Sequence, residues 1–224
     1  MQIENFNLTS RQSEQFETYF QELINYNEKV NLTAITDKEE GFIKHFYDSA
    51  LAKDILPQNA TVLDIGTGAG FPGLPLKIMR DDIKLTLVDS LNKRVEFLKV
   101  ITDKLNLDVE CIHSRAEDFA KTHREFFDVV CARAVASLTT LCEYTLPLVR
   151  VGGCFIAYKG ANYKDELENA QNAIKLLGGK VKQTLEFELP KSMGSRALII
   201  IEKIQHTNPK YPRPKNFPKL KPIK

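Results

Sequence analysis

Three alternating glycines, Gly66, Gly68 and Gly70, follow directly on a short apolar run at residues 61–65. Glycine lets the backbone turn sharply and approach a ligand closely, and a helix that begins after such a turn favours a negatively charged group. Pro72 can open that helix, and the next apolar run ends in an acid, Asp89. A carboxylate there can accept hydrogen bonds from ribose hydroxyls. This order of strand, glycine loop, helix, strand and acid predicts a site for a cofactor that contains adenosine.

Simpler explanations of the same residues are a plain tight turn for the loop and a solvated strand-end acid for Asp89. The order of the elements disfavours both, since the three alternating glycines come directly after Asp64. The pattern is Asp-x-Gly-x-Gly-x-Gly rather than the Gly-x-Gly-x-x-Gly of a dinucleotide site. It resembles the glycine loop of S-adenosylmethionine-dependent methyltransferases, and we predict that cofactor.

Residues after two later apolar runs should face the same crevice, because ligands bind outside the carboxyl ends of parallel strands. Ala116 and Glu117 follow the third run and are placed to line an adenine ring. Ser114 and Glu117 also have the spacing of a capping box, so a purely structural role is an equal alternative. Arg133 ends the fourth run, where a methyl donor would meet its acceptor. The alternative for Arg133 is a surface or ion-paired arginine.

The acceptor is constrained by motifs that the fourth run lacks. It has no Asn/Asp-Pro-Pro-Tyr/Phe motif for an exocyclic amine, and Cys131 is not preceded by the proline expected beside a nucleophile for pyrimidine C5. No Ser-His-Asp set or pair of carboxylates suggests a general base. Guanine N7 carries an unprotonated lone pair, so its methylation can depend mainly on positioning and exclusion of water. The sequence is compatible with that acceptor.

The first fifty residues show helical periodicity. Thr9 with Gln12 and Thr36 with Glu39 have capping-box spacing, so we expect a helix to begin after each threonine. In the second helix three polar residues fall together, away from the apolar face, at 100° per residue. With Asn31 they form a polar cluster that is either a buried network or a wall of the acceptor pocket. The three residues are His45, Asp48 and Ser49.

Short apolar runs alternate with segments of helical period from residue 61 onward. This alternation predicts an α/β fold in which a doubly wound, seven-stranded, mostly parallel sheet carries helices on both faces. Only a short turn separates the last two runs, which should form a hairpin. The expected strands are residues 61–65, 85–89, 109–113, 127–132, 154–158, 184–189 and 197–202. The expected helices are residues 73–80, 92–105, 116–123, 138–149 and 164–177.

Charge is distributed unevenly along the 224 residues. We divide the chain into an N-terminal helical extension (1–57), a cofactor-binding domain (58–202) and a basic, proline-rich tail (203–224). The tail carries seven Lys or Arg residues and no acid, whereas the residues before it carry 24 basic and 29 acidic groups, a net charge of −5. Such a tail indicates a polyanionic partner and should extend as an arm. Alternatively it is a solvated end, or it packs on the body through Tyr211, Phe217 and Leu220.

The composition, with 43% apolar and 27% charged residues, is that of an ordinary globular protein. The longest apolar runs are far too short to span a membrane, and the first residues show no signal peptide. We therefore expect a cytoplasmic protein without membrane association. The four cysteines form no Cys-x-x-Cys pair, which favours reduced, buried thiols over a metal site.

Several blocks together resemble one family, the bacterial small-subunit ribosomal RNA methyltransferase G, also called glucose-inhibited division protein B. The glycine loop alone indicates only the methyltransferase superfamily, whereas the Asn-Leu-Thr and His-Phe-x-Asp-Ser blocks are specific to the family. The family pattern has a glycine near residues 215–218, which this chain lacks. The blocks are residues 31–36, 44–49, 64–73, 87–98, 115–117, 132–134, 159–160 and 211–213.

The resemblance implies methylation of N7 of a guanine in the decoding-region loop of 16S rRNA. The implied partner is 16S rRNA or the small ribosomal subunit, and we expect a monomer. Two other functions stay open: a methyltransferase for a small molecule or protein, and a non-catalytic RNA-binding module that retains a cofactor pocket.

The candidate site residues fall into three groups, none of them assigned as a catalyst or metal ligand. The cofactor-binding candidates are Asp64, Gly66, Gly68, Gly70, Phe71, Asp89, Ala116, Glu117 and Arg133. Phe71 is included because the resemblance implies that it contacts the cofactor. The acceptor-pocket candidates are Asn31, His45, Asp48, Ser49 and Arg133. The RNA-binding candidates are Arg94, Lys159, Arg196, Lys210, Arg213, Lys215, Lys219 and Lys221.

Overall fold

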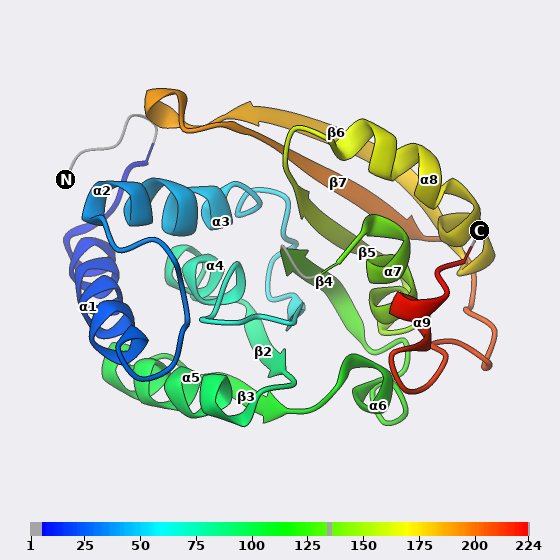
Figure 1. The fold of residues 1–224 in the computed structure, drawn as a ribbon, viewed down its shortest axis with the longest axis horizontal. Helices are drawn as coiled ribbons and strands as arrows, with labels where there is room; N and C mark the ends of the chain where they lie inside the picture. Colours follow the sequence, from blue (N-terminus) through cyan, green and yellow to red (C-terminus); the bar gives the residue numbers. More distant parts are fainter. Residues whose placement is uncertain (1–5, 134–135, 224) are drawn as a thin grey trace.

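A seven-stranded sheet with helices on both sides forms the centre of the molecule (Figure 1). The structure is a computed structural model that describes residues 6–133 and 136–223. Three parts of the sequence analysis lie outside these residues, namely the N-terminal residues 1–5, Ala134 of the block at 132–134 and Lys224 of the tail. The strands are β1 (Thr61–Ile65), β2 (Lys84–Asp89), β3 (Val109–His113), β4 (Phe127–Arg133), β5 (Val149–Lys159), β6 (Gly179–Glu188) and β7 (Ser195–Lys203).

The order of the strands in the sheet is β3-β2-β1-β4-β5-β7-β6. Strands β1 to β5 pair in parallel, whereas β7 runs antiparallel to both β5 and β6, so the last two strands form the expected hairpin. The order reverses between β1 and β4, which opens a crevice at the carboxyl ends of these strands. The predicted doubly wound, mostly parallel α/β fold is confirmed.

Helices cover both faces of this sheet. They are α4 (Gly73–Met79), α5 (Asn92–Leu105), α6 (Ala116–Phe119), α7 (Leu138–Thr145) and α8 (Tyr163–Leu176). Apolar side chains of α4 and α5 pack on one face, and those of α6, α7 and α8 pack on the other. Two helices are shorter than predicted. α6 gives way to turns after Phe119, and α7 ends before Pro147, which cannot continue a helix.

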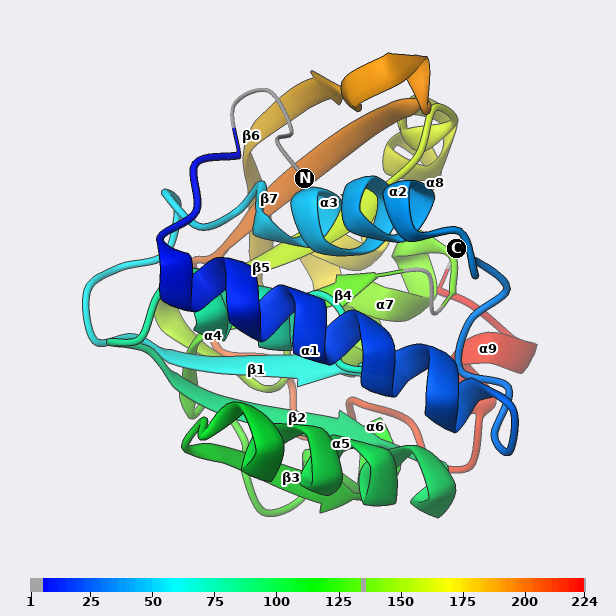
Figure 2. The same ribbon diagram turned by 90° about the vertical axis from the view of Figure 1, so that its left-hand side faces the viewer.

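The N-terminal extension consists of α1 and a continuous helical run. Its elements are α1 (Ser10–Asn27), α2 (Lys38–Gly41), η1 (Phe42–Tyr47) and α3 (Asp48–Ala50). The first predicted capping box is confirmed, since Thr9 and Gln12 exchange hydrogen bonds at the start of α1. The second is wrong by one residue, because Asp37 rather than Thr36 accepts the hydrogen bond that caps α2, from the Glu40 amide at 2.8 Å. α1 lies on the outside of the molecule and packs against α4 and α5 (Figure 2).

The C-terminal segment, residues 204–223, packs on the body of the protein, so the expectation of an extended arm is wrong. Lys203 belongs to β7 and is fully buried, and its ammonium group donates to the carbonyl of Leu146 and to the hydroxyl of Thr207. Tyr211 is 7% exposed, whereas Leu220 is 75% exposed. The segment ends in a short helix, α9 (Phe217–Leu220), which lies beside α7 (Figure 1).

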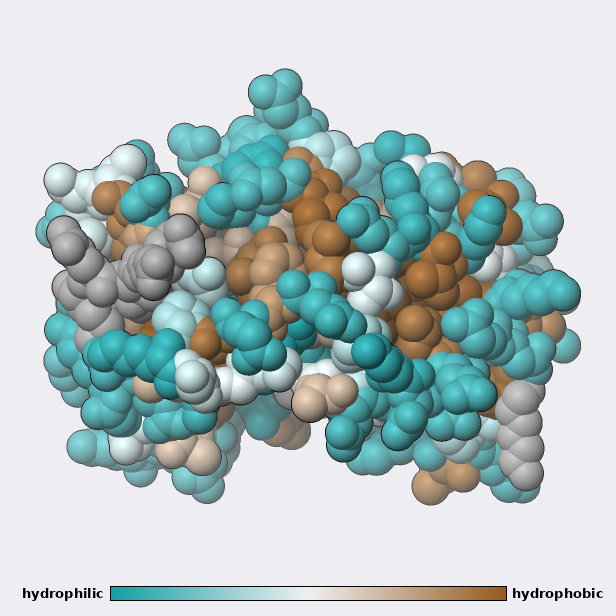
Figure 3. Space-filling model, turned by 90° about the horizontal axis from the view of Figure 1, so that it is seen from above, coloured by the Kyte–Doolittle hydropathy of each residue, from teal (hydrophilic) through white to brown (hydrophobic). Residues whose placement is uncertain are grey.

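The surface carries mostly polar side chains. Figure 3 shows one face on which hydrophilic residues predominate and smaller hydrophobic areas lie between them. Within residues 6–133 and 136–223, no helix is long and apolar enough to cross a membrane, and no group of three or more His, Cys, Asp or Glu side chains could hold a metal ion. The four cysteines are free thiols, and Cys131 and Cys142 are buried.

Candidate active site

Three adjoining cavities open where the strand order reverses, at the carboxyl ends of β1, β2, β4 and β5. The Glu117 cavity has a volume of about 210 Å³, and its lining includes Gly66, Asp89, Ala116, Glu117, Tyr144 and Asn216. The glycine-loop cavity has a volume of about 350 Å³, and its lining includes Gly66, Gly68, Phe71, Asp89, Arg94 and Arg133. The Asp48 cavity has a volume of about 520 Å³, and its lining includes Lys44, His45, Asp48, Arg133, Lys159 and Arg196.

The glycine loop is held in place by two carboxylates. Asp64, fully buried at the end of β1, accepts hydrogen bonds through Oδ2 from the Thr67 hydroxyl at 2.7 Å and the Gly73 amide at 2.8 Å. Asp89 accepts through Oδ2 from the Gly68 amide at 2.9 Å. Gly68 has φ +62°, and a Cβ built on it meets no atom within 4 Å. The loop therefore leaves open space beside its backbone, as a bound cofactor requires.

Glu117 is held by the C-terminal segment rather than by a helix cap. The predicted capping box with Ser114 does not form, since the Ser114 hydroxyl donates to the Arg115 carbonyl and Arg115 occupies the N-cap position of α6. Glu117 is 6% exposed and accepts through Oε1 from the backbone amide of Asn216 at 3.0 Å. Ala116, Glu117 and Asp89 thus line one cavity, as expected for an adenosine site.

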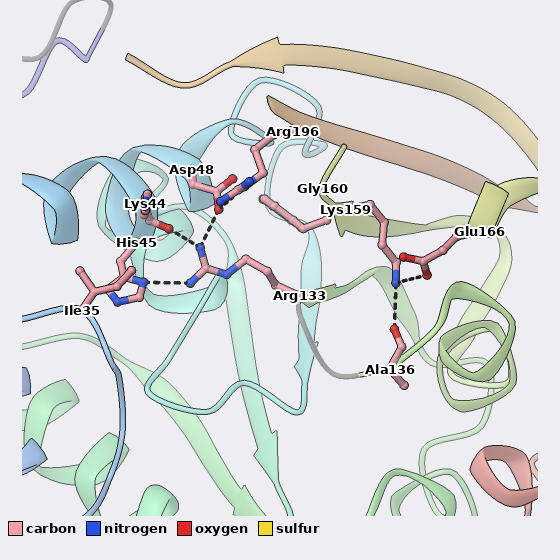
Figure 4. A pocket seen from close by; sticks show the side chains of 11 residues that line it. Ile35, Lys44, His45, Asp48, Arg133, Ala136, Lys159, Gly160, Glu166 and Arg196 are labelled. Atoms are coloured by element: carbon pink, nitrogen blue, oxygen red, sulfur yellow. Dashed lines mark hydrogen bonds and ion pairs between the residues drawn. The ribbon is translucent and has the colours of Figure 1, made fainter. Parts of the chain in front are cut away.

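Arg133 stands at the junction of the other two cavities, at the carboxyl end of β4 (Figure 4). Its Nη1 donates to Asp48 Oδ2 and to the Lys44 carbonyl, both at 2.9 Å. Asp48 is 1% exposed, and the same Oδ2 also accepts from Nε of Arg196 at 3.1 Å. One buried carboxylate from the N-terminal extension therefore orients two arginines from the sheet.

Aromatic rings form a stack beside Arg133. The Phe71 ring stacks on His45, with ring centroids 4.6 Å apart, and on Tyr19, at 5.5 Å. The guanidinium of Arg133 lies 5.0 Å from the centroid of Phe71. Burial, together with the positive charges of Arg133 and Lys44, lowers the pKa of His45 to about 3, so the imidazole is neutral at physiological pH. Thr33 Oγ1 lies 2.8 Å from its Nε2.

Two further groups near the crevice, the Lys159 ammonium and the Cys131 thiol, are not available as nucleophiles. Lys159, 7% exposed at the end of β5, donates to Glu166 at 2.7 Å and to the Ala136 carbonyl at 2.8 Å (Figure 4). Burial raises the pKa of the Cys131 thiol well above its usual range, so this thiol does not become a nucleophilic thiolate.

Comparison with known proteins agrees with this geometry. The family model for rRNA small subunit methyltransferase G matches residues 12–198. The chain belongs to this family. Among its relatives, the ribosomal RNA small subunit methyltransferase G of Alkaliphilus metalliredigens is 51% identical, over 98% of this chain and 94% of that protein. The one from Oceanobacillus iheyensis is 50% identical, over 97% of this chain and 93% of that protein.

Solved structures share the fold at low sequence identity. The O-methyltransferase from Bacillus cereus, in complex with SAH, aligns with a TM-score of 0.60 and 17% identity, over 88% of this chain and 92% of that chain. A SAM-dependent methyltransferase from Aquifex aeolicus aligns with a TM-score of 0.55 and 18% identity, over 74% of this chain and 93% of that chain. Family membership confirms the predicted enzyme class, an S-adenosylmethionine-dependent methyltransferase of small-subunit rRNA.

Some of the predicted cofactor and acceptor residues line the cavities, and others do not. Asp64 is buried beneath the glycine loop, and Gly70 lies on the side of the loop that faces α1, where a Cβ built on it would collide with Tyr19 Oη. Ser49 is fully buried and donates to the His45 carbonyl. Asn31 is exposed on the loop before α2. The remaining candidates of these two groups line at least one of the three cavities.

The RNA-binding candidates divide by their partners. Lys159 and Arg213 are held by the carboxylates of Glu166 and Glu143. Arg94 lines the glycine-loop cavity with Nη1 3.6 Å from Asp89 Oδ2. Arg196 lines the Asp48 cavity. The exposed candidates are Lys210, Lys215, Lys219 and Lys221.

The cavities are also lined by residues that sequence reasoning did not assign, among them Lys44, Tyr144, Tyr158 and Asn216. Lys44 and Tyr158 carried a signal, because one begins the block at residues 44–49 and the other ends an apolar run. Tyr144 lies on α7 and Asn216 in the C-terminal segment, and no local pattern connects either with the glycine loop.

Substitution Gly68→Val should abolish binding of S-adenosylhomocysteine, because the side chain would fill the open space beside the loop. Gly152→Val is the matched control, since Gly152 also has positive φ (+84°) but lies near the start of β5, at the opposite end of the strand from the cavities. Both variants should lose some stability through backbone strain, roughly 1–3 kcal/mol. Isothermal titration well below the melting temperature checks this. Undiminished binding by the Gly68 variant would refute the position of the site.

Asp64 should make stability fall as pH rises through the acidic range. Burial raises its pKa to about 7, although hydrogen bonds from Thr67 and Gly73 and the charge of Arg133 oppose the shift. The unfolded chain therefore loses the proton first, and the free energy of unfolding should fall by roughly 2–4 kcal/mol between about pH 4 and pH 7, then level off. Asp64→Asn should remove this dependence.

The measurement is urea unfolding of wild type and variant across that range. Asp82→Asn is the control, because hydrogen bonds from Arg80 hold the pKa of Asp82 well below its usual range. Asp82 is ionised in both folded and unfolded states above about pH 5, so its removal should leave the slope there unchanged. Parallel curves for wild type and the Asp64 variant would contradict the assignment.

Proposed function

We propose that the chain transfers a methyl group from S-adenosylmethionine to N7 of a guanine in the decoding-region loop of 16S rRNA. The observation that supports this acceptor best is the chemistry around Arg133, where the glycine-loop cavity meets the Asp48 cavity. His45 is a poor proton acceptor at neutral pH because its pKa is about 3, and the Oδ2 atom of Asp48 already accepts hydrogen bonds from two arginines. An acceptor atom that gives up no proton suits such a site.

The residues of the chain fit the methyl donor. When bound, S-adenosylmethionine supplies an electrophilic methyl group on a positively charged sulfur. The carboxylate of Asp89 is placed to accept hydrogen bonds from the ribose, and Ala116 and Glu117 line the space for the adenine. Gly66 and Gly68 let the backbone approach the amino-acid part in the glycine-loop cavity.

The Asp48 cavity fits a nucleotide. Lys44, Arg133 and Arg196 bring positive charge to its wall, where phosphate oxygens and the acceptors O6 and N7 of guanine would find donors. Arg133 holds a fixed direction through Asp48, so it can orient the base while its other face lies on Phe71. Closure of RNA over this cavity would exclude water from the transfer.

The exposed cations extend the RNA surface. We assign phosphate contacts to Lys210, Lys215 and Lys221, and to Arg94 and Arg196 at the cavity mouths. Arg213 and Lys159 serve structure first, because Arg213 anchors the C-terminal segment on Glu143 and Lys159 is 7% exposed and paired with Glu166. With an rRNA or small ribosomal subunit as substrate, we expect the enzyme to act in the cytoplasm.

Incubation of the protein with labelled cofactor and small ribosomal subunits from a strain that lacks this gene should yield 7-methylguanosine. Nuclease digestion and mass analysis of the 16S rRNA identify the modified nucleoside and its position. Label in 5-methylcytosine or N6-methyladenine would refute the proposed acceptor. Label in a protein or small molecule only would favour another methyltransferase substrate.

The maximal rate should vary little between about pH 6 and pH 9, because no side chain has to accept a proton from N7. Asp64, with its pKa near 7, is the one assigned group near the loop that could bend the profile indirectly. The profile is therefore measured in wild type and in Asp64→Asn. A pH dependence of the rate that disappears in the variant arises from titration of Asp64 beneath the loop. A steep pH dependence that persists in the variant would reveal a general base and contradict the mechanism.

A further inference from the structure

We propose that the C-terminal segment forms one wall of the cofactor site, so that S-adenosylmethionine binds only to the protein with this segment docked. The inference rests on the cofactor assignment made above and concerns Asn216 and Lys219. Both line the Glu117 cavity together with Gly66, Asp89 and Ala116. The segment thus closes the side of the cavity that the sheet leaves open.

Contacts at Asn216 join the segment to the cofactor residues on α6. Its backbone amide donates to Glu117 Oε1 at 3.0 Å, and its side-chain oxygen accepts from Arg115 Nη1 at 2.9 Å. Lys215 and Asn216 have φ of +54° and +57°, which turns the chain toward the cavity. The hydrogen bond therefore holds both Glu117 and the segment in position. Binding of a cofactor to Glu117 should depend on whether the segment is docked.

An ion pair anchors the segment behind this contact. Glu143 on α7 is 1% exposed and accepts from Nε of Arg213 at 2.8 Å and from its Nη2 at 2.6 Å. The backbone amide of Arg213 donates to the same carboxylate at 2.8 Å. Removal of the guanidinium would leave a buried carboxylate short of partners, a costly state that undocking of the segment would relieve.

Further contacts fix the rest of the segment on the domain. Arg124 donates to the carbonyls of Tyr211 at 2.7 Å and Thr207 at 2.6 Å. The Thr140 hydroxyl donates to the Pro218 carbonyl, and Pro218 is buried against α7. These contacts hold the segment on the domain. Cofactor affinity should therefore depend on a segment that lies more than eighty residues after α6 in the sequence.

The test is titration of S-adenosylhomocysteine into wild type, Arg213→Met and a chain truncated after Thr207, which keeps the buried Lys203–Thr207 contact. Each change should weaken affinity roughly tenfold or more at a temperature where the variant is folded. Leu220→Ala is the control, because Leu220 lies on the same segment but is 75% exposed and outside the cavity. It should bind as wild type.

Limited trypsin digestion of wild type gives a second readout that needs no variant. Saturating S-adenosylhomocysteine should slow cleavage after Lys210, Lys215 and Lys219 but not after Lys38, which is exposed in the N-terminal extension. Unchanged affinity in folded Arg213→Met, or cleavage unaffected by the cofactor, would overturn the proposal. Wild type that fails to bind S-adenosylhomocysteine would instead refute the cofactor site itself.

Discussion

The buried contact between Asp48 and Arg133 fixes the geometry of the whole site. It joins the N-terminal extension to the carboxyl end of β4, with 2.9 Å between the carboxylate and the guanidinium. Without the extension, the end of β4 would face solvent and the Asp48 cavity would lack one wall. The same carboxylate holds Arg196 from β7, so a single acid sets the positions of two cations where donor and acceptor meet.

A second contact of the extension reaches the glycine loop. Tyr19 on α1 is fully buried, donates to the Ala69 carbonyl at 2.5 Å and stacks on Phe71. A larger residue than glycine at position 70 would collide with this tyrosine. The conformation of the glycine loop therefore depends on hydrogen bonds to Asp64 and on packing against Tyr19 of α1. Both the N-terminal extension and the sheet thus form the active site.

Much of the fold could be predicted because parallel strands buried on both faces appear as continuous apolar runs. The buried strand at residues 61–65 is found with the predicted bounds, as is the half-exposed edge strand at 109–113. The glycine loop and Asp89 meet as their order along the chain requires. The second cap was wrong, since Asp37 and Thr36 are adjacent and either could end the loop. Local spacing alone does not decide between them.

The conformation of the C-terminal segment could not be predicted from its net charge. Its basic residues were counted without their partners, and the pairing of Arg213 with Glu143 spans seventy residues and leaves no local pattern. The same holds for Lys159 and Glu166, which lie seven positions apart and are brought together by the turn between β5 and α8. Long-range pairing of this kind follows from the packed fold, so sequence periodicity could not reveal it.

A double-mutant cycle on the Asp48–Arg133 pair tests the central claim most directly. Methyl transfer to small ribosomal subunits is measured as kcat/KM for Asp48→Asn, Arg133→Met and the combined variant, with folding checked by circular dichroism. If the carboxylate acts by orienting the guanidinium, the losses overlap, and the cycle should give a coupling energy of roughly 1–3 kcal/mol. If the free-energy losses of the two single variants add up to that of the combined variant, Arg133 is equally effective without Asp48, and the account is contradicted.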